Sequence, residues 1–200
     1  MPSKRMRDRF DQARLVNIAN GLTTTRVLLV PLFAYLLIEG NFRYALLVFA
    51  VCGLSDMLDG LLARWLRQRT LLGFLLDPIA DKILMATSFV ILAIVKVVPA
   101  WLAIMIVSRD LFILVGSILI LLILGMGEIE VTGTGKVNTI VQIATVLYFL
   151  TVRAFPGFLD TLSAGIEPVA TYGVVLLCAA STGISGIHYL AIGLRKFSRA

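Results

Sequence analysis

Four aspartates lie close together along an otherwise apolar part of the sequence: Asp56, Asp59, Asp77 and Asp81. A charge within a membrane costs about 3 kcal/mol or more, so acidic residues there usually line a polar cavity, pair with cations or bind ions. Oxygen ligands favour hard divalent ions such as Mg²⁺, Mn²⁺ or Ca²⁺ over zinc, and Mg²⁺ often completes its shell with substrate phosphates. A carboxylate left partly free of metal could act as a general base on an incoming hydroxyl. The four residues therefore predict metal-dependent chemistry on a phosphate-bearing substrate.

The spacing of these aspartates predicts two helical stripes. In a helix, Asp56 and Asp59 fall on one stripe, while Asp77 and Asp81, four residues apart, fall on another. Small residues share the stripes and leave room beside the acids: Gly60 and Ala63 on the first, and Gly73 on the second. Two antiparallel helices joined by a short turn would present the stripes to each other. We therefore expect a four-carboxylate cluster with adjacent space, which requires neutralising cations.

Intramembrane salt bridges are the structural alternative for these acids. Four basic residues could pair with them: Arg26, Arg64, Lys82 and Arg109. Some pairing is expected. Structural salt bridges, however, do not require four acids at regular helical spacing beside two glycines and an alanine. We therefore favour the functional interpretation.

The composition places the aspartates in a membrane protein. Of the 200 residues, 59% are hydrophobic and only 15% are charged, and the mean hydropathy is +0.96. Soluble domains have much less apolar content, whereas apolar windows of about twenty residues are typical of membrane spans. We expect an all-α integral membrane protein with six transmembrane helices. They cover residues 17–38, 43–64, 72–96, 100–124, 137–153 and 169–193.

The distribution of Lys and Arg predicts the orientation of these helices. With the N-terminus in the cytoplasm, three basic residues lie outside: Arg43, Lys96 and Arg153. Twelve lie on the cytoplasmic side: Lys4, Arg5, Arg7, Arg9, Arg14, Arg64, Arg67, Arg69, Lys136, Arg195, Lys196 and Arg199. Both termini are then cytoplasmic, and the aspartate motif opens to the cytoplasmic face of a bacterial inner membrane or an organellar membrane.

Residues 1–16 form a basic segment in which Met6 and Phe10 lie four positions apart. This pattern favours a short interfacial helix attracted to anionic lipid headgroups. A disordered basic tail that only enforces topology is the alternative. The charged stretch does not resemble a cleavable signal peptide. Residues 17–200 show no linker, low-complexity tract or repeat, so we expect a single domain there.

Two residue types that often mark sites are assigned no function. Cys52 and Cys178 lie in apolar segments and are expected to pack as small hydrophobic side chains. The single His188 is too solitary for a histidine metal site and is expected to be structural or interfacial. The net charge of +6 is explained by topology and anionic lipid, so no nucleic-acid partner is expected.

The spaced residues match a known family at every fixed position. The pattern Asp-x2-Asp-Gly-x2-Ala-Arg-x8-Gly-x3-Asp-x3-Asp, from Asp56 to Asp81, is the signature of the CDP-alcohol phosphotransferases, which this sequence resembles. Eight fixed positions in 26 residues make a specific signal. The segment from Asn17 to Arg26 is similar to the start of the family's first helix, with Ala19 where proline is usual. The six-helix plan agrees, so the resemblance covers nearly the whole chain.

The resemblance implies an enzyme that transfers a substituted phosphoryl group from a CDP-linked donor to an alcohol and releases CMP. It implies divalent metal, two ions of Mg²⁺ or Mn²⁺, held by Asp56, Asp59 and Asp77, with Asp81 near a metal and acting as the base. It places the CDP moiety at Asn20, Thr23, Gly60, Ala63, Arg64 and Gly73. The donor would be CDP-diacylglycerol, which enters laterally from the membrane lipids, and the family implies a homodimer.

The acceptor alcohol is expected to contact residues of the later helices. Arg109, Lys136 and Asn138 are the candidate acceptor-binding residues. Arg109 lies in an apolar segment and needs an anionic partner. A substrate phosphate would serve, and an ion pair with a motif carboxylate is the alternative.

Two subfamilies with different acceptors are candidates, and their sequences differ near these residues. Phosphatidylglycerophosphate synthases take glycerol 3-phosphate and typically show Ala-Arg-Glu with a second arginine eight residues later, whereas here Ser108, Arg109 and Asp110 are followed by Ser117. The phosphomonoester of glycerol 3-phosphate is a dianion, so its binding would favour that second arginine as an additional cation. Cardiolipin synthases take phosphatidylglycerol, whose phosphodiester carries one charge, and the stretches 105–110 and 136–142 resemble theirs. We therefore favour phosphatidylglycerol over glycerol 3-phosphate.

A cation transporter is the alternative from a different class of protein, because it too could use intramembrane carboxylates. Transporters of this size usually show inverted repeats and midplane sites. Here the acids cluster near one face and no repeat is evident. The sequence therefore favours the enzyme.

Overall fold

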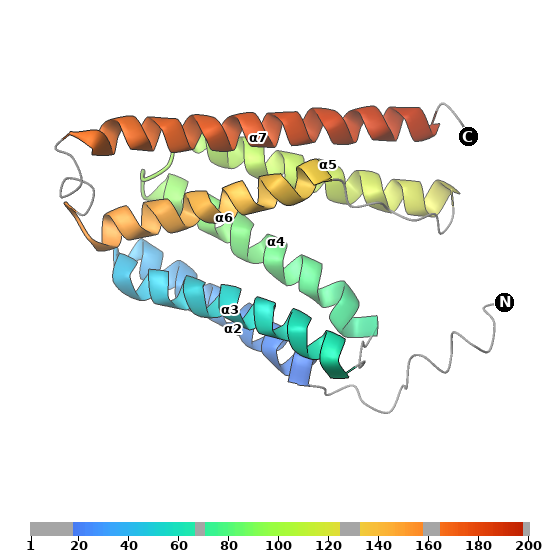
Figure 1. The fold of residues 1–200 in the computed structure, drawn as a ribbon, viewed down its shortest axis with the longest axis horizontal. Helices are drawn as coiled ribbons and strands as arrows, with labels where there is room; N and C mark the ends of the chain where they lie inside the picture. Colours follow the sequence, from blue (N-terminus) through green and yellow to red (C-terminus); the bar gives the residue numbers. More distant parts are fainter. Residues whose placement is uncertain (1–17, 67–70, 125–132, 158–164, 198–200) are drawn as a thin grey trace. The chain divides into compact units, whose positions relative to one another are not determined.

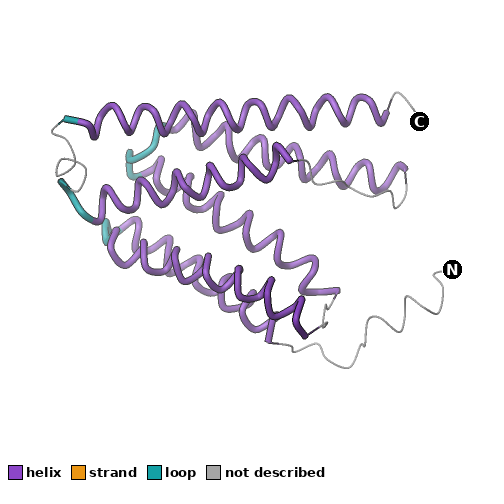
Figure 2. Tube along the Cα trace, in the orientation of Figure 1, coloured by secondary structure: helices purple, strands orange, loops and turns teal. Residues whose placement is uncertain are grey.

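The computed structural model describes residues 18–66, 71–124, 133–157 and 165–197, with side chains over 28–55, 82–116, 133–157 and most of 165–193. Six helices fill these ranges. They are α2 (Ile18–Ile38), α3 (Phe42–Leu66), α4 (Leu71–Ile94), α5 (Ala100–Leu124), α6 (Gly133–Ala154) and α7 (Ile166–Phe197). Every described element is a helix or a short loop, as Figure 2 shows. The all-α prediction is confirmed, and each helix lies where the sequence predicts one.

Two described segments are long and apolar enough to cross a membrane, Gly133–Ala154 in α6 and Glu167–Gly193 in α7. Three shorter helical stretches are also apolar: Leu28–Ile38, Phe42–Ser55 and Lys82–Ile94. Many large hydrophobic side chains face outward, among them Phe112 at 78% exposure. Exposed apolar surface of this kind suits contact with lipid. The interfacial helix predicted over residues 1–16 lies outside the described residues.

The chain divides into two compact units, residues 1–87 and 88–200. In the first unit α2 and α3 lie side by side (Figure 1). The buried rings of Phe33 and Phe49 meet there with centroids 5.7 Å apart. Gly40 ends α2 in the left-handed conformation, with φ +72°, and its N–H donates to the Leu37 carbonyl at 3.1 Å. Glycine is favoured at this capping position because a Cβ would be strained there.

In the second unit α7 packs against both α5 and α6 (Figure 1). The buried positions on α6 and α7 recur at alternating intervals of three and four, the spacing of interlocking helices. On α6 these positions are Gly135, Asn138, Gln142, Thr145 and Phe149. On α7 they are Val175, Cys178, Thr182 and Ser185. Small or polar residues make up most of these positions, which lets helix backbones approach closely, as in membrane bundles.

Side-chain hydrogen bonds show the direction of α6 relative to α7. Near one end Thr134 Oγ1 lies 2.9 Å from His188 Nδ1, and near the other Tyr148 Oη lies 3.0 Å from Thr171 Oγ1. Residue numbers rise along α6 while they fall along α7, so the two helices are antiparallel. The contact of His188 agrees with the structural or interfacial role expected for it.

The glycines of α7 show that α5 runs parallel to α7. A Cβ on Gly183 would lie 3.3 Å from Met105 Cε, and a Cβ on Gly186 would lie 3.6 Å from Arg109 Cγ. Numbers therefore rise together along α5 and α7. Since α6 runs the other way, the three helices pass back and forth, as successive membrane crossings would.

Candidate functional site

The aspartate motif is carried by two continuous helices. Asp56 and Asp59 lie on α3, which continues beyond Arg64, while Asp77 and Asp81 lie on α4. The helical backbone on which the stripe prediction depends is therefore present. The side chains of these residues lie outside the described ones, as do those of Asn20, Thr23, Gly60, Ala63, Arg64 and Gly73. Their roles in binding metal and CDP remain predictions.

Metal binding depends on the same motif. Over the side chains that the structure describes, no group of three His, Cys, Asp or Glu residues could hold a metal ion, and the motif aspartates are not among those side chains. The donor set of Asp56, Asp59, Asp77 and Asp81 consists of oxygen atoms alone, at helical spacing on α3 and α4. Such donors fit Mg²⁺ or Mn²⁺ rather than a softer metal.

Arg109 has an anionic partner that the sequence analysis did not consider. Its Nη1 donates to Asp110 Oδ1 at 2.6 Å, so the pair is formed by adjacent residues of α5. Only 9% of the Arg109 side chain and 14% of the Asp110 side chain are exposed. The guanidinium charge is therefore largely neutralised without a substrate phosphate.

Helix α7 holds the other side of this guanidinium. Arg109 Nη2 donates to Ser185 Oγ, and the Tyr189 ring centroid lies 5.5 Å from the guanidinium carbon. Gly186 provides room for the aliphatic part of the arginine. These contacts fix the orientation of Arg109, whose Nε is buried without a hydrogen-bond partner.

Asn138 lies in the interface between α6 and α7 and is completely buried. Its Oδ1 accepts hydrogen bonds from Ser181 Oγ at 3.0 Å and from Thr182 Oγ1 at 3.1 Å. Its Nδ2 is buried without a partner. Asn138 thus joins two helices through its oxygen and retains one free donor group. Lys136, two residues earlier, is exposed.

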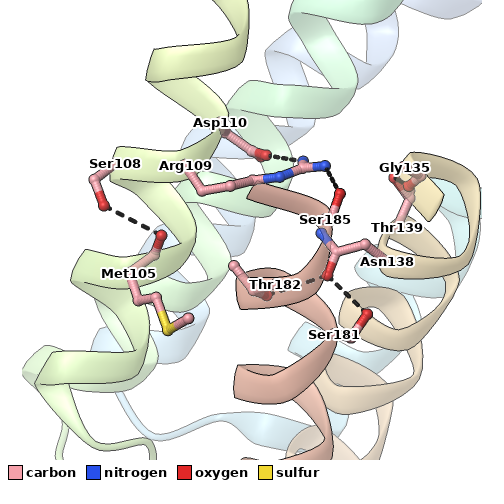
Figure 3. A network of polar contacts seen from close by, with 10 residues as sticks. All are labelled: Met105, Ser108, Arg109, Asp110, Gly135, Asn138, Thr139, Ser181, Thr182 and Ser185. Atoms are coloured by element: carbon pink, nitrogen blue, oxygen red, sulfur yellow. Dashed lines mark hydrogen bonds and ion pairs between the residues drawn. The ribbon is translucent and has the colours of Figure 1, made fainter. Parts of the chain in front are cut away.

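Arg109 and Asn138 belong to one polar network, which Figure 3 shows. Arg109 reaches from α5 and Asn138 from α6, and they contact neighbouring hydroxyls of α7. Two of the three predicted acceptor-binding residues are therefore brought together, whereas Lys136 is exposed and is not among the residues of this network that Figure 3 draws.

Cys52 and Cys178 do not contribute to a disulfide. Both are free and buried, with exposures of 1% and 0%. Both cysteines are therefore buried free thiols, and the Cys178 side chain is hydrogen-bonded to Thr145 and Thr182.

The sequence profile of the CDP-alcohol phosphatidyltransferases matches residues 16–191. This range contains the whole aspartate motif and the polar network of the second unit. The chain belongs to this family. It is therefore a member of a family of transferases, and the resemblance inferred from the motif is confirmed.

Relatives of this family member carry two different names. The human cardiolipin synthase (CMP-forming) is 48% identical over 98 residues, which cover 48% of the chain and 33% of the human protein. A probable cardiolipin synthase of Drosophila melanogaster is 32% identical over 165 residues, covering 72% of the chain and 51% of that protein. A probable phosphatidylglycerophosphate synthase of Mycobacterium tuberculosis is 32% identical over 192 residues, covering 92% of the chain and 85% of that protein. The chain thus spans a third to a half of these two cardiolipin synthases.

The residues of α7 in this network were not identified from the sequence, nor was a buried amide on α6. Ser181, Thr182 and Ser185 form a hydroxyl stripe on α7. Gln142 is buried on α6, and its amide has no hydrogen-bond partner. The spacing of the hydroxyls, with two of them four residues apart on an apolar helix, was a usable signal. What faces this stripe depends on helix packing, which the spacing alone does not show.

Removing Asp110 alone is expected to destabilise the protein. Asp110→Ala deprives the mostly buried Arg109 guanidinium of its carboxylate, and loss of one partner of a buried pair costs about 3 kcal/mol or more. The double variant Arg109→Met, Asp110→Ala removes both charges, so it should unfold at a temperature closer to that of wild type. The measurement is the unfolding temperature in detergent of wild type, Asp110→Ala and the double variant. The exposed-site variant Glu39→Ala is the control. A double variant less stable than Asp110→Ala would contradict the expected pairing.

Proposed function

We propose that this chain is a multi-pass membrane enzyme that transfers the phosphatidyl group of CDP-diacylglycerol to phosphatidylglycerol, forming cardiolipin and CMP. One observation carries the proposal: the complete eight-position motif lies on two consecutive helices of a chain that belongs to the CDP-alcohol phosphatidyltransferases. Relatives named cardiolipin synthase (CMP-forming) support the choice of reaction.

The membrane topology that we propose has six spans, with both termini and the aspartate motif on the cytoplasmic side. The excess of basic residues on that side supports it. The alternating directions of α5, α6 and α7 are those of three consecutive crossings. The membrane would be a bacterial inner membrane or an organellar one, and we propose a homodimer within it.

In the reaction, the acceptor hydroxyl oxygen forms a bond to the phosphorus that carries diacylglycerol. The bond from this phosphorus to the CMP oxygen breaks, and CMP leaves with its electron pair. Asp81 takes the proton of the attacking hydroxyl as general base. Divalent ions held by Asp56, Asp59 and Asp77, with Asp81 near a metal, would stabilise negative charge on the phosphoryl and leaving groups. In-line attack then depends on how the chain positions the two substrates.

The donor would be positioned by residues that flank the aspartates on α2, α3 and α4. The backbone of each of these segments is helical. Small residues would let the CDP moiety approach the helices, and Arg64 would contact its phosphates. The proposed CDP-binding residues are Asn20, Thr23, Gly60, Ala63, Arg64 and Gly73.

The charge near Arg109 supports phosphatidylglycerol as the acceptor. Asp110 already neutralises the guanidinium, and among its nitrogen atoms only Nε lacks a partner. A singly charged phosphodiester suits this site better than a dianionic phosphomonoester, which favours several cationic donors. The alternative is phosphatidylglycerophosphate synthesis from glycerol 3-phosphate. The Mycobacterium tuberculosis relative of that name supports it, because its match covers 92% of the chain.

An acceptor competition tests the choice between these two reactions. Purified protein receives CDP-diacylglycerol with glycerol 3-phosphate, phosphatidylglycerol, inositol phosphate and serine together, and the lipid products are identified by mass. We expect cardiolipin to exceed the other products at least tenfold, as a difference of about 1.4 kcal/mol in transition-state binding would give. Consumption of glycerol 3-phosphate alone would contradict the choice of phosphatidylglycerol.

A further inference from the structure

Four buried side-chain atoms lack a hydrogen-bond partner over the described part of the chain, and all belong to the second unit. They are Arg109 Nε, Asn138 Nδ2, Gln142 Nε2 and Gln142 Oε1. Leaving a buried polar atom unpaired costs about 1–3 kcal/mol, and such atoms are rare in folded proteins. Asn138 and Gln142 are both completely buried, so bulk water does not reach them. A bound molecule would supply the missing partners.

These atoms lie at successive levels along α6 and α7. The pair of half-buried Thr134 and exposed His188 marks one end. Asn138, one turn further along α6, meets hydroxyls of α7, and Gln142 follows after another turn on the same buried face. At about 1.5 Å per residue, Gln142 lies about 12 Å along the helix from Thr134. Polar groups thus extend from an exposed helix end to the middle of an apolar helix.

Arg109 joins the same set from α5. Its Nη2 donates to Ser185, which lies one turn along α7 from Ser181, a hydrogen-bond partner of Asn138. Figure 3 shows the guanidinium and the Asn138 amide on either side of Ser185. The unpaired donors of Arg109 and Asn138 therefore belong to one local site.

The unpaired atoms define the chemistry of the missing partner. Three are nitrogen donors and one, Gln142 Oε1, is an acceptor. The partner must offer several hydrogen-bond acceptors and at least one hydrogen-bond donor, such as a hydroxyl group. Because Asp110 neutralises Arg109, the site does not favour more than a single negative charge. A phosphodiester with free hydroxyls in its head group meets all three requirements.

We propose that Gln142, together with Asn138 Nδ2 and Arg109 Nε, forms a binding site for the hydroxyl-bearing phosphodiester head group of the acceptor. Arg109 Nε donates to a phosphate oxygen, and the amide of Gln142 both donates to and accepts from head-group hydroxyls. Gln142 is thereby a specificity-determining residue. This assignment rests on the proposed function, because it identifies the acceptor site of that reaction.

The Gln142→Leu variant tests the site, because leucine has a similar volume and cannot form hydrogen bonds. We expect the KM for phosphatidylglycerol to rise about tenfold, the effect of losing a buried hydrogen bond, while the KM for CDP-diacylglycerol is unchanged. Thr145→Val is the matched control. Thr145 lies one turn along the same buried face, but its hydroxyl already donates to the Val141 carbonyl at 2.8 Å. Both KM values should be unchanged in this control.

A binding measurement without CDP-diacylglycerol separates this site from the reaction. Mixed micelles containing phosphatidylglycerol should raise the unfolding temperature of wild type, and the shift should be lost in Gln142→Leu. Phosphatidylethanol is the reference lipid, because it is a phosphodiester with no free hydroxyl and should give a smaller shift. Glycerol 3-phosphate, tested in the same way, distinguishes a soluble head group from a lipid one.

Three outcomes would overturn the assignment. If Gln142→Leu lowers the unfolding temperature equally with every lipid and leaves both KM values unchanged, the site holds internal water only. If the variant is more stable than wild type with unchanged KM values, nothing binds there. If glycerol 3-phosphate alone gives the shift, the ligand is not a phosphodiester. Absence of CMP release by wild type would instead contradict the proposed function, while the micelle measurement would still test the binding site.

Discussion

The Asp81→Asn variant is expected to release CMP from CDP-diacylglycerol about 10³-fold more slowly than wild type, since general-base catalysis contributes about 10²- to 10⁴-fold. Asparagine has nearly the shape of aspartate but cannot take the proton of the attacking hydroxyl. Binding of the donor and of divalent metal should remain largely intact, because Asp56, Asp59 and Asp77 are unchanged. Initial rates of CMP release and a titration with CDP-diacylglycerol measure the two effects separately.

The control for this variant is Glu39→Gln, which makes the same change from carboxylate to amide at an exposed position beyond the end of α2. It should retain the wild-type rate. Full activity of Asp81→Asn would remove the role of Asp81 as base. A loss of donor binding equal to the loss of rate would instead assign Asp81 to substrate binding.

Removal of divalent cations is expected to stop the reaction. In the proposed cluster the four carboxylates would repel one another strongly without a cation, and the phosphoryl group being transferred would lose its charge stabilisation. Incubation with EDTA followed by dialysis should reduce CMP release to background, and adding Mg²⁺ or Mn²⁺ should restore it.

The control for chelation is addition of Zn²⁺ at the same concentration, which should restore much less activity because all-oxygen sites favour harder ions. The unfolding temperature of the metal-free protein shows whether lost activity reflects lost folding. A metal-free protein that remains fully active would refute the proposed metal site.

The helices could be predicted from the sequence with good accuracy. Apolar windows gave spans over 100–124 and 17–38, and the structure has α5 at Ala100–Leu124 and α2 at Ile18–Ile38. The turn after α2 follows from Gly40, because its positive φ suits glycine. These features depend on residues that are close together in the sequence, so a single sequence is sufficient to predict them.

The partner of Arg109 could not be predicted in the same way. Adjacent residues of a helix point about 100° apart and do not normally face each other, so spacing argued against Asp110. The long arginine side chain reaches its neighbour because Ser185 and Tyr189 hold it from α7. Which residues of α7 face α5 depends on helix packing, and no pattern within α5 contains that information.

For Asn138, the sequence identified the residue as a candidate but did not predict its contacts. Asn138 was a candidate acceptor-binding residue because it lies in the stretch 136–142, which resembles that of the cardiolipin synthases. Its complete burial against Ser181 and Thr182 depends on how α6 is aligned with α7. The sequence indicated no separate role for Gln142, although both polar atoms of its amide are buried without a hydrogen-bond partner.

The most direct test of the central claim is the stoichiometry of CMP release. Purified protein in micelles with CDP-diacylglycerol, phosphatidylglycerol and Mg²⁺ should release one CMP for each cardiolipin formed. Omitting the donor should abolish both products, and omitting phosphatidylglycerol should abolish cardiolipin. The contradicting result is a folded protein that releases no CMP with any alcohol acceptor and instead conducts divalent cations across lipid vesicles.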